Sequence, residues 1–213
     1  MADVTVRDLR ILVSSRAARA AILFVTAFVL AACGGRAPLP EPGSSRGVAP
    51  DLRGVRVLLL PVQQNLGVAG DPDAEFAYGL RERGQGVAWI SAADVEERMA
   101  RSPGTQARTR GLPVGVFLQA EVDRVGDPLY GELRRTAALV DAEAVVLPVQ
   151  AALAATPGED PRVRLWTALI DVRTGRVAWF SVLEGGAFPA GDPRGLASAV
   201  DEVARTLLWY VGG

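Results

Sequence analysis

The sequence predicts an α/β fold, an α+β sandwich in which a mixed sheet of about five strands packs against helices. Three observations support this class. Two near-continuous apolar runs, over 55–62 and 144–149, are typical of strands buried on both faces. Residues 162–183 alternate in polarity on either side of a tight turn, which indicates a C-terminal β-hairpin. Residues 193–211 repeat apolar side chains at helical spacing and predict a helix that closes the domain.

Residues 1–32 are organised as an export signal. Arg16 and Arg19 precede an apolar run over 20–30, and two alanines follow the run. This is the order of a secretory signal peptide. The run is shorter than the roughly 20 residues that a membrane-spanning helix requires, so we expect the segment to be removed from the mature protein.

The junction at Cys33 resembles the lipobox of bacterial lipoproteins. Leu30, Ala31 and Ala32 precede the cysteine, and Gly34 follows it. An ordinary secretory cut after Ala32 would require a small residue in place of Leu30, whereas a large residue there suits the lipoprotein peptidase. The resemblance implies that Cys33 becomes the lipidated first residue of the mature protein. Plain secretion and an uncleaved anchor are the alternatives.

Cys33 is the single cysteine of the 213-residue chain and has no disulfide partner within it. The lipoprotein class implies a thioether-linked diacylglycerol on this residue, typically with palmitate chains, and usually an amide-linked third chain. At about 0.8 kcal/mol per buried CH₂, two or more chains give stable membrane anchoring. By the enterobacterial sorting rule, Gly34 in place of Asp implies the outer membrane, with the domain facing the periplasm. The inner membrane is the alternative.

Residues 33–53 are predicted to be a lipidated tether that precedes a single globular domain over 54–213. Pro, Gly, Ser and Ala dominate the tether, without a periodic apolar pattern. Such a segment buries too little apolar surface to offset its ordering entropy. Ser44 and Ser45 are interpreted as part of this spacer, which either gives the domain reach across the envelope or is a spacer and nothing more.

The first half of the domain is predicted to alternate strands with helices. Asp71 is a helix N-cap with a proline at the first helical position, and the helix ends before Gly84. A short strand over 87–90 follows. Ser91 then caps a second helix over 92–100.

The middle of the domain is less regular. Residues 102–111 are polar and predict a loop. Residues 114–125 fit both an alternating strand and a helical face, and we favour the helix. A clearer helix is expected over 127–140. Pro148 lies near the end of the strand over 144–149, and a proline there disfavours a central place in the sheet for this strand.

The hairpin carries a family resemblance. Asp171, Thr174, Gly175 and Trp179 match the hairpin pattern of the TolB amino-terminal-domain-like group of envelope proteins, which includes curli-channel (CsgG-like) proteins and lipoprotein activators of penicillin-binding proteins. Pro148 departs from the group, whose strand often has glycine there. The resemblance implies an α/β sandwich that takes part in protein–protein interactions at the cell envelope. The matched residues have structural roles, and the group offers no catalytic residue to carry over.

The composition excludes several functions. The chain is near neutral, with a formal net charge of −1, and shows no basic stripe, so no nucleic-acid partner is expected. Histidine is absent, which excludes Ser–His and Cys–His nucleophile systems and His-ligated metals. No phosphate-binding glycine loop follows the first strand. We expect no cofactor and no metal.

Two sets of residues retain alternative interpretations. Trp166 and Phe180 mark a binding surface if one sheet face is open, and belong to the core if a helix covers it. Paired carboxylates are either acid–base candidates or solvated turn and helix-end residues, and we favour the latter. These pairs are Asp71/Asp73, Glu96/Glu97 and Asp141/Glu143.

The sequence therefore predicts a lipid-anchored envelope protein, not an enzyme, that binds another envelope protein or polymer as an assembly or accessory module. A subunit of a curli-type secretion channel is the alternative within the binding class. A carboxylate-based cell-wall hydrolase is the alternative from another class.

Overall fold

The computed structural model describes residues 38–101, 104 and 107–211, which contain one mixed seven-stranded sheet. The strand order is β1-β7-β6-β5-β2-β4, and β3 pairs with β5 beyond the segment that pairs with β2. β2 pairs in parallel with β4 and β5, whereas β5, β6, β7 and β1 are successively antiparallel. The strands are β1 (Ser44–Gly47), β2 (Arg56–Leu59), β3 (Gln64–Leu66), β4 (Ala88–Ser91), β5 (Ala144–Ala154), β6 (Arg162–Asp171) and β7 (Val177–Ala187).

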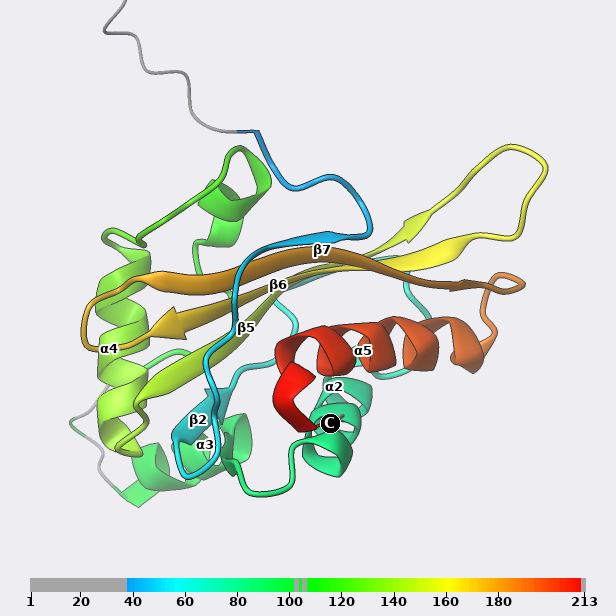
Figure 1. Ribbon diagram of the computed structural model, residues 1–213. Helices are drawn as coiled ribbons and strands as arrows, with labels where there is room; N and C mark the ends of the chain where they lie inside the picture. The colour runs from blue at the N-terminus through cyan, green and yellow to red at the C-terminus, as the bar shows by residue number, and fades with distance from the viewer. Residues whose placement is uncertain (1–37, 102–103, 105–106, 212–213) are drawn as a thin grey trace, which may run out of the picture. The chain divides into compact units, whose positions relative to one another are not determined.

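Helices cover both faces of the sheet, which confirms the predicted α/β sandwich. α2 and α5 lie together on one face, and α3, α4 and the short turn η1 contribute to the core on the other (Figure 1). Within the described ranges, no helix has the length and apolar character needed to cross a bilayer. The helical elements are α2 (Pro72–Arg83), α3 (Ala92–Arg101), η1 (Val114–Leu118), α4 (Leu129–Leu139), α5 (Pro193–Leu207) and η2 (Trp209–Val211).

Each face of the sheet has its own hydrophobic core. On the α2/α5 face, Trp179 is 2% exposed and packs in one cluster with Phe76 and Leu207. On the α4 face, Phe180 stacks on Phe117 with ring centroids 5.5 Å apart. The two aromatic residues of β7 therefore point to opposite faces, as the period of two in a strand requires.

The helix starts predicted at Asp71 and Ser91 are confirmed by their capping bonds, whereas the helix expected from residue 127 begins at Leu129 without a side-chain cap. Asp71 Oδ1 accepts the backbone N–H groups of Asp73 and Ala74, each at 3.1 Å. At α3, the N–H of Ser91 donates to Asp94 Oδ2 at 2.7 Å, and the N–H of Asp94 donates back to Ser91 Oγ at 3.3 Å. This is a reciprocal capping box. The hydrogen bond from the Ser91 hydroxyl and then the one from its backbone lower the pKa of Asp94.

The hairpin turn has the structure that its sequence predicts. Asp171 Oδ1 accepts both the N–H and the hydroxyl of Thr174, each at 2.7 Å. Gly175 has a φ of 70°, the left-handed region that favours glycine. A Cβ there would also lie 3.0 Å from the ring of Tyr130. The turn therefore needs glycine for both its backbone angle and its contact with α4.

The tether prediction is wrong for residues 38–53. Ser44 and Ser45, interpreted as spacer, belong to β1, which pairs with β7 at the edge of the sheet. Ala49 and Leu52 are 2% and 1% exposed and lie in the α2/α5 core. Pairing with an existing strand satisfies the backbone polar groups of a segment that has little apolar surface of its own. The folded domain therefore begins well before residue 54.

Three other expectations also need correction. The sheet has seven strands where about five were expected, and the sequence interpretation did not identify β1 and β3. Residues 114–125 form only η1 followed by irregular chain, so neither the helix nor the strand exists at its expected length. β5 is central and continues past Pro148, because a register shift between Pro148 and Gln150 accommodates the proline.

An open sheet face as the candidate functional site

At the end of the sheet far from α4, the strands extend beyond the helices. β5 and β6 form a long hairpin that projects from the body of the domain (Figure 1). Alternate side chains of this arm continue the face that the α4 core covers elsewhere. They lie in register with side chains of β3 and β7 and form two cross-strand rows. The rows are Gln64–Gln150–Trp166–Val182–Ser44 and Leu66–Ala152–Arg164–Glu184.

We define the Trp166 face as Leu66, Ala152, Arg164, Trp166 and Glu184. Leu66 is 55% exposed, and the other four side chains are half-buried. Of the two aromatic residues singled out from the sequence, Trp166 therefore lies on a partly open face and Phe180 lies in the core. Trp166 packs with one part of its side chain against the α4 core, and Leu66 is the exposed large apolar side chain of the face. Apolar and aromatic side chains that stay partly exposed on one face are typical of an interaction site.

The charged residues of the Trp166 face are held in fixed positions. Arg164 Nε donates to Glu184 Oε1 at 2.6 Å, and its guanidinium carbon lies 5.6 Å from the centroid of the Trp166 ring. The neighbouring Arg162 donates from Nη1 to the carbonyl oxygen of Gly185 at 3.1 Å. A cation over an indole face contributes about 0.5–1 kcal/mol at exposed sites. The face thus presents an ordered tryptophan and a neutralised ion pair.

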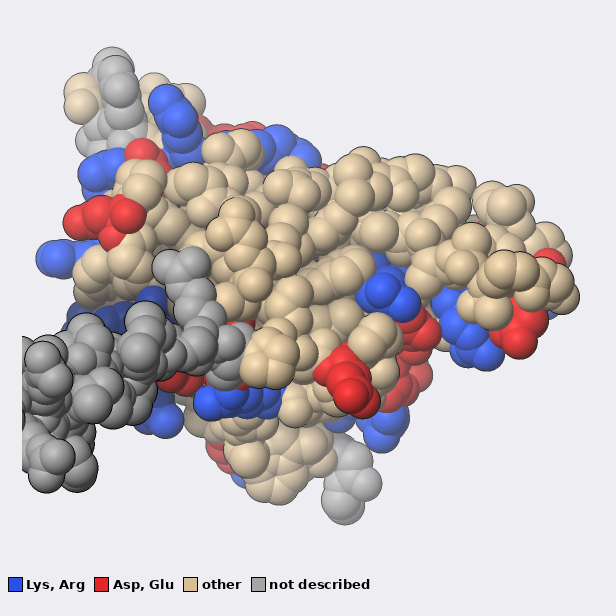
Figure 2. All heavy atoms as spheres, turned by 90° about the horizontal axis from the view of Figure 1, so that it is seen from above, with Lys and Arg blue, Asp and Glu red and all other residues tan. Residues whose placement is uncertain are grey.

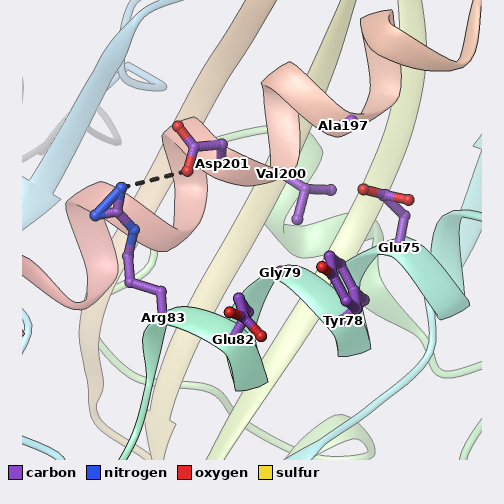
Figure 3. Close-up of a pocket in the computed structure, with 8 residues that line it drawn as sticks. All are labelled: Glu75, Tyr78, Gly79, Glu82, Arg83, Ala197, Val200 and Asp201. Atoms are coloured by element: carbon purple, nitrogen blue, oxygen red, sulfur yellow. Dashed lines mark hydrogen bonds and ion pairs between the residues drawn. The ribbon is translucent and has the colours of Figure 1, made fainter.

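A second concave surface lies between α2 and α5 (Figure 3). The groove has a volume of about 430 Å³. Gly79 forms its floor, and a Cβ at Gly79 would lie 2.6 Å from Val200 Cγ1, so the two helices approach closely there. Tyr78 is 65% exposed at the rim. Arg83 Nη2 lies 3.3 Å from Asp201 Oδ1 and joins the two helices across the groove (Figure 3).

Five of the six carboxylates paired in the sequence make local structural contacts, and the sixth, Asp141, lies in the turn after α4 with a φ of 51°. Asp71 caps α2, and Asp73 accepts the N–H of Val62 at 2.6 Å and pairs with Arg110 at 2.6 Å. Glu97 pairs with Arg101 along α3. Glu96 accepts the hydroxyl of Thr109 at 3.3 Å, and Glu143 accepts the N–H of Arg56 at 3.3 Å. These contacts favour the interpretation of the pairs as turn and helix-end residues.

The charge distribution matches the near-neutral composition. Seen from above, uncharged side chains form a broad area, with arginine and acidic residues in small mixed groups, and no extended patch of one sign is visible in that view (Figure 2). Among residues 38–101, 104 and 107–211, no cluster of three or more His, Cys, Asp or Glu side chains is arranged to hold a metal ion.

The predicted lipidation site lies outside the described residues, as do its recognition residues Leu30, Ala31, Ala32 and Gly34 around Cys33. The sequence interpretation also missed Leu66, because β3 has only three residues and its neighbours suggest a loop. Its pairing with β5 is a tertiary contact that no local pattern signals. The confirmed roles are those of Asp171, Gly175 and Trp179 in the hairpin.

Comparison with solved structures finds partial similarities. A PelC dodecamer from Paraburkholderia phytofirmans matches with a TM-score of 0.41 and 20% identity, over 79% of this chain and 98% of that chain. The LpoB C-terminal domain from Salmonella enterica matches with a TM-score of 0.39 and 16% identity, over 67% and 87% of the two chains. Lipoprotein GNA1162 from Neisseria meningitidis matches with a TM-score of 0.37 and 14% identity, over 62% and 81%.

No protein-family model and no curated protein matches this sequence. Because the TM-scores of these structures lie below 0.5, the function of the chain has to be argued from its own residues.

Proposed function

We propose that this chain is a lipid-anchored protein of the cell envelope, facing the periplasm, whose domain binds another envelope protein. The lipobox at Leu30–Gly34 supports the anchor. The Trp166 face supports the binding role and is the observation on which this proposal rests. The domain acts as an assembly or accessory module and performs no catalysis of its own.

The Trp166 face suits a protein partner better than a small molecule. It is an extended area of sheet that crosses β3, β5, β6 and β7, rather than an enclosed pocket. Tryptophan and arginine are enriched among the residues that dominate protein–protein binding energy. Since Glu184 already neutralises Arg164, burial of this pair leaves no unpaired charge. The expected partner surface is apolar at its centre, opposite Leu66 and Trp166.

Site-specific photocrosslinking in the host tests this proposal. A photoreactive phenylalanine analogue replaces Leu66 in one strain and Tyr78 in a control strain. Both side chains are exposed, at 55% and 65%, but Tyr78 lies in the α2/α5 groove. We expect a discrete crosslink to a different envelope protein from position 66, lost when Trp166→Ala is added. A partner captured only from position 78, or from neither position, would contradict the proposal.

The same experiment addresses the alternative of a curli-type channel. If the crosslinked product from position 66 contains only copies of this chain, then the face joins subunits and the channel interpretation is favoured. Fractionation of a Cys33→Ser variant tests the anchor separately. We expect this variant to leave the membrane fraction, because it has no thiol to acylate.

A further inference from the structure

Two of the most exposed apolar residues of the domain are linked through the backbone, because Trp209 contacts the residue that follows Val48. Val48 is 76% exposed and Trp209 is 57% exposed. Trp209 Nε1 donates to the carbonyl oxygen of Ala49 at 2.8 Å, so the indole nitrogen is satisfied while the ring remains in solvent. The segment that leaves β1 runs beside the C-terminal turn η2 (Figure 1). This contact brings together residues from the two ends of the described chain.

The surroundings of these two side chains are ordered. The rings of Trp209 and Tyr210 meet edge to face with centroids 6.0 Å apart, and the Arg53 guanidinium lies 5.3 Å from the Tyr210 centroid. Arg53 is also paired with Asp51. We define the Val48–Trp209 patch as Val48, Arg53, Trp209 and Tyr210. Val48, Arg53 and Trp209 are exposed and are of the types that favour the interface between a bilayer and water, whereas Tyr210 is half-buried and packs against the α2/α5 core.

The length of chain before the domain limits the distance of this patch from an anchor at Cys33. Leu39 packs against the α4 core. At about 3.3–3.6 Å per residue, the chain from Cys33 to Leu39 reaches roughly 20 Å. A turn closed by the hydrogen bond from the Ser44 N–H to the Glu41 carbonyl leads into β1. β1 spans about 13 Å, and Val48 follows its last residue. The N-terminal edge of the domain, from Leu39 to Val48, is therefore within reach of a bilayer that holds an anchor at Cys33.

We propose that the Val48–Trp209 patch rests on the surface of the bilayer that holds the acyl chains of Cys33, with the Trp209 indole at headgroup depth. This inference rests on the lipid anchor of the proposed function. Strand register places the Trp166 face away from the patch, because Trp166 aligns with Ser44 at the start of β1 through Val182, and Val48 follows its end. The contact would therefore leave the Trp166 face available to a partner protein.

Quenching of tryptophan fluorescence by brominated lipids tests the contact. The protein is purified from host membranes and reconstituted into phosphatidylethanolamine and phosphatidylglycerol vesicles with brominated acyl chains. The chain has four tryptophans, so single Trp→Phe variants assign the quenched emission. We expect quenching in the unmodified protein and in the control Trp166→Phe, and its loss in Trp209→Phe. Quenching that survives Trp209→Phe, or that disappears in Trp166→Phe, would overturn the inference.

A second variant tests the same contact independently, in case Trp209→Phe impairs folding. Val48→Asp keeps all four tryptophans and changes an exposed side chain. We expect it to reduce the quenching at least twofold, because a carboxylate disfavours contact with the bilayer. Unchanged quenching in this variant contradicts the inference. If the purified protein carries no acyl chains and is not retained by vesicles, the anchor itself is wrong. Retention without quenching overturns only the bilayer contact.

Discussion

The guanidinium of Arg164 lies over the indole ring of Trp166, with its central carbon 5.6 Å from the ring centroid, while its Nε donates to Glu184. Arg164 and Trp166 belong to β6 and Glu184 to the neighbouring β7, and Arg164 contacts both of the other side chains. The result is an ordered tryptophan on a part of the sheet that the helices leave half-exposed. This arrangement is the basis of the binding role that we propose.

The ion pair of this face should be measurably coupled. We expect Arg164→Ala and Glu184→Ala to show a coupling free energy of about 0.2–1 kcal/mol in a double-mutant cycle, since both side chains are partly exposed. Urea denaturation of the two single variants and the double variant measures it. Strictly additive losses would show that the contact between Arg164 and Glu184 does not stabilise the arm.

Thr167 and Ser181 face one another in register on β6 and β7, and both are fully buried. Neither hydroxyl oxygen has a hydrogen-bond partner. An unpaired buried polar group costs about 1–3 kcal/mol, so we expect Thr167→Val to leave the free energy of unfolding unchanged or raise it by about 1 kcal/mol. Thermal or urea unfolding checks this. A loss of 1 kcal/mol or more would mean that the hydroxyl is paired in the folded protein.

Gly185 is required by the close approach of α5 to β7. A Cβ there would lie 2.4 Å from Ser198 Oγ and 2.6 Å from the backbone nitrogen of Ala199. We expect Gly185→Ala to lower the free energy of unfolding by about 1–3 kcal/mol, as overpacking does. Gly115→Ala is the control, because a Cβ at Gly115 meets no atom within 4 Å. Equal stability of the two variants in denaturant would refute the close packing.

The carboxylate of Asp171 makes a pH-dependent contribution to stability. Burial raises its pKa, but hydrogen bonds from the side chain and backbone of Thr174, together with the charge and backbone of Arg173, outweigh burial and hold the pKa below its ordinary value. A lowered folded-state pKa stabilises the fold above the unfolded-state pKa, and this stabilisation is lost as the pH falls through the folded-state value.

Asp171→Asn removes the charge and keeps one acceptor oxygen. We therefore expect it to destabilise the fold by up to about 1 kcal/mol at pH 7, and the difference from the unmodified protein to shrink below about pH 4. Urea titrations at pH 7 and at pH 3 measure this difference. A deficit that is constant over this range would exclude the charge as its cause.

The sequence predicts those parts of the fold that depend on local chemistry. The N-cap at Asp71, the turn at Gly175 and the apolar stripe of α5 follow from side chains a few residues apart, and the structure confirms all three. The α5 stripe ends earlier than expected, because the chain turns into η2. The mixed α/β class also follows from the order of these elements.

The parts that could not be predicted depend on pairing between distant segments. β1 and β3 are short and polar, and each exists because a neighbouring strand offers free backbone groups. For the same reason the sequence identifies Trp166 as a candidate but gives no sign that Leu66 lies on the same face. The exposed part of a sheet face depends on where the covering helices end. The alternation of polar and apolar residues along a strand does not show where that is.

Mass spectrometry of the N-terminal peptide, on protein isolated from its own host, tests the lipid anchor most directly. We expect the mature chain to begin at Cys33 and to carry a diacylglycerol on the sulfur. An unmodified thiol at Cys33, or a mature chain that retains residues 1–32, would show that the protein is not anchored in this way.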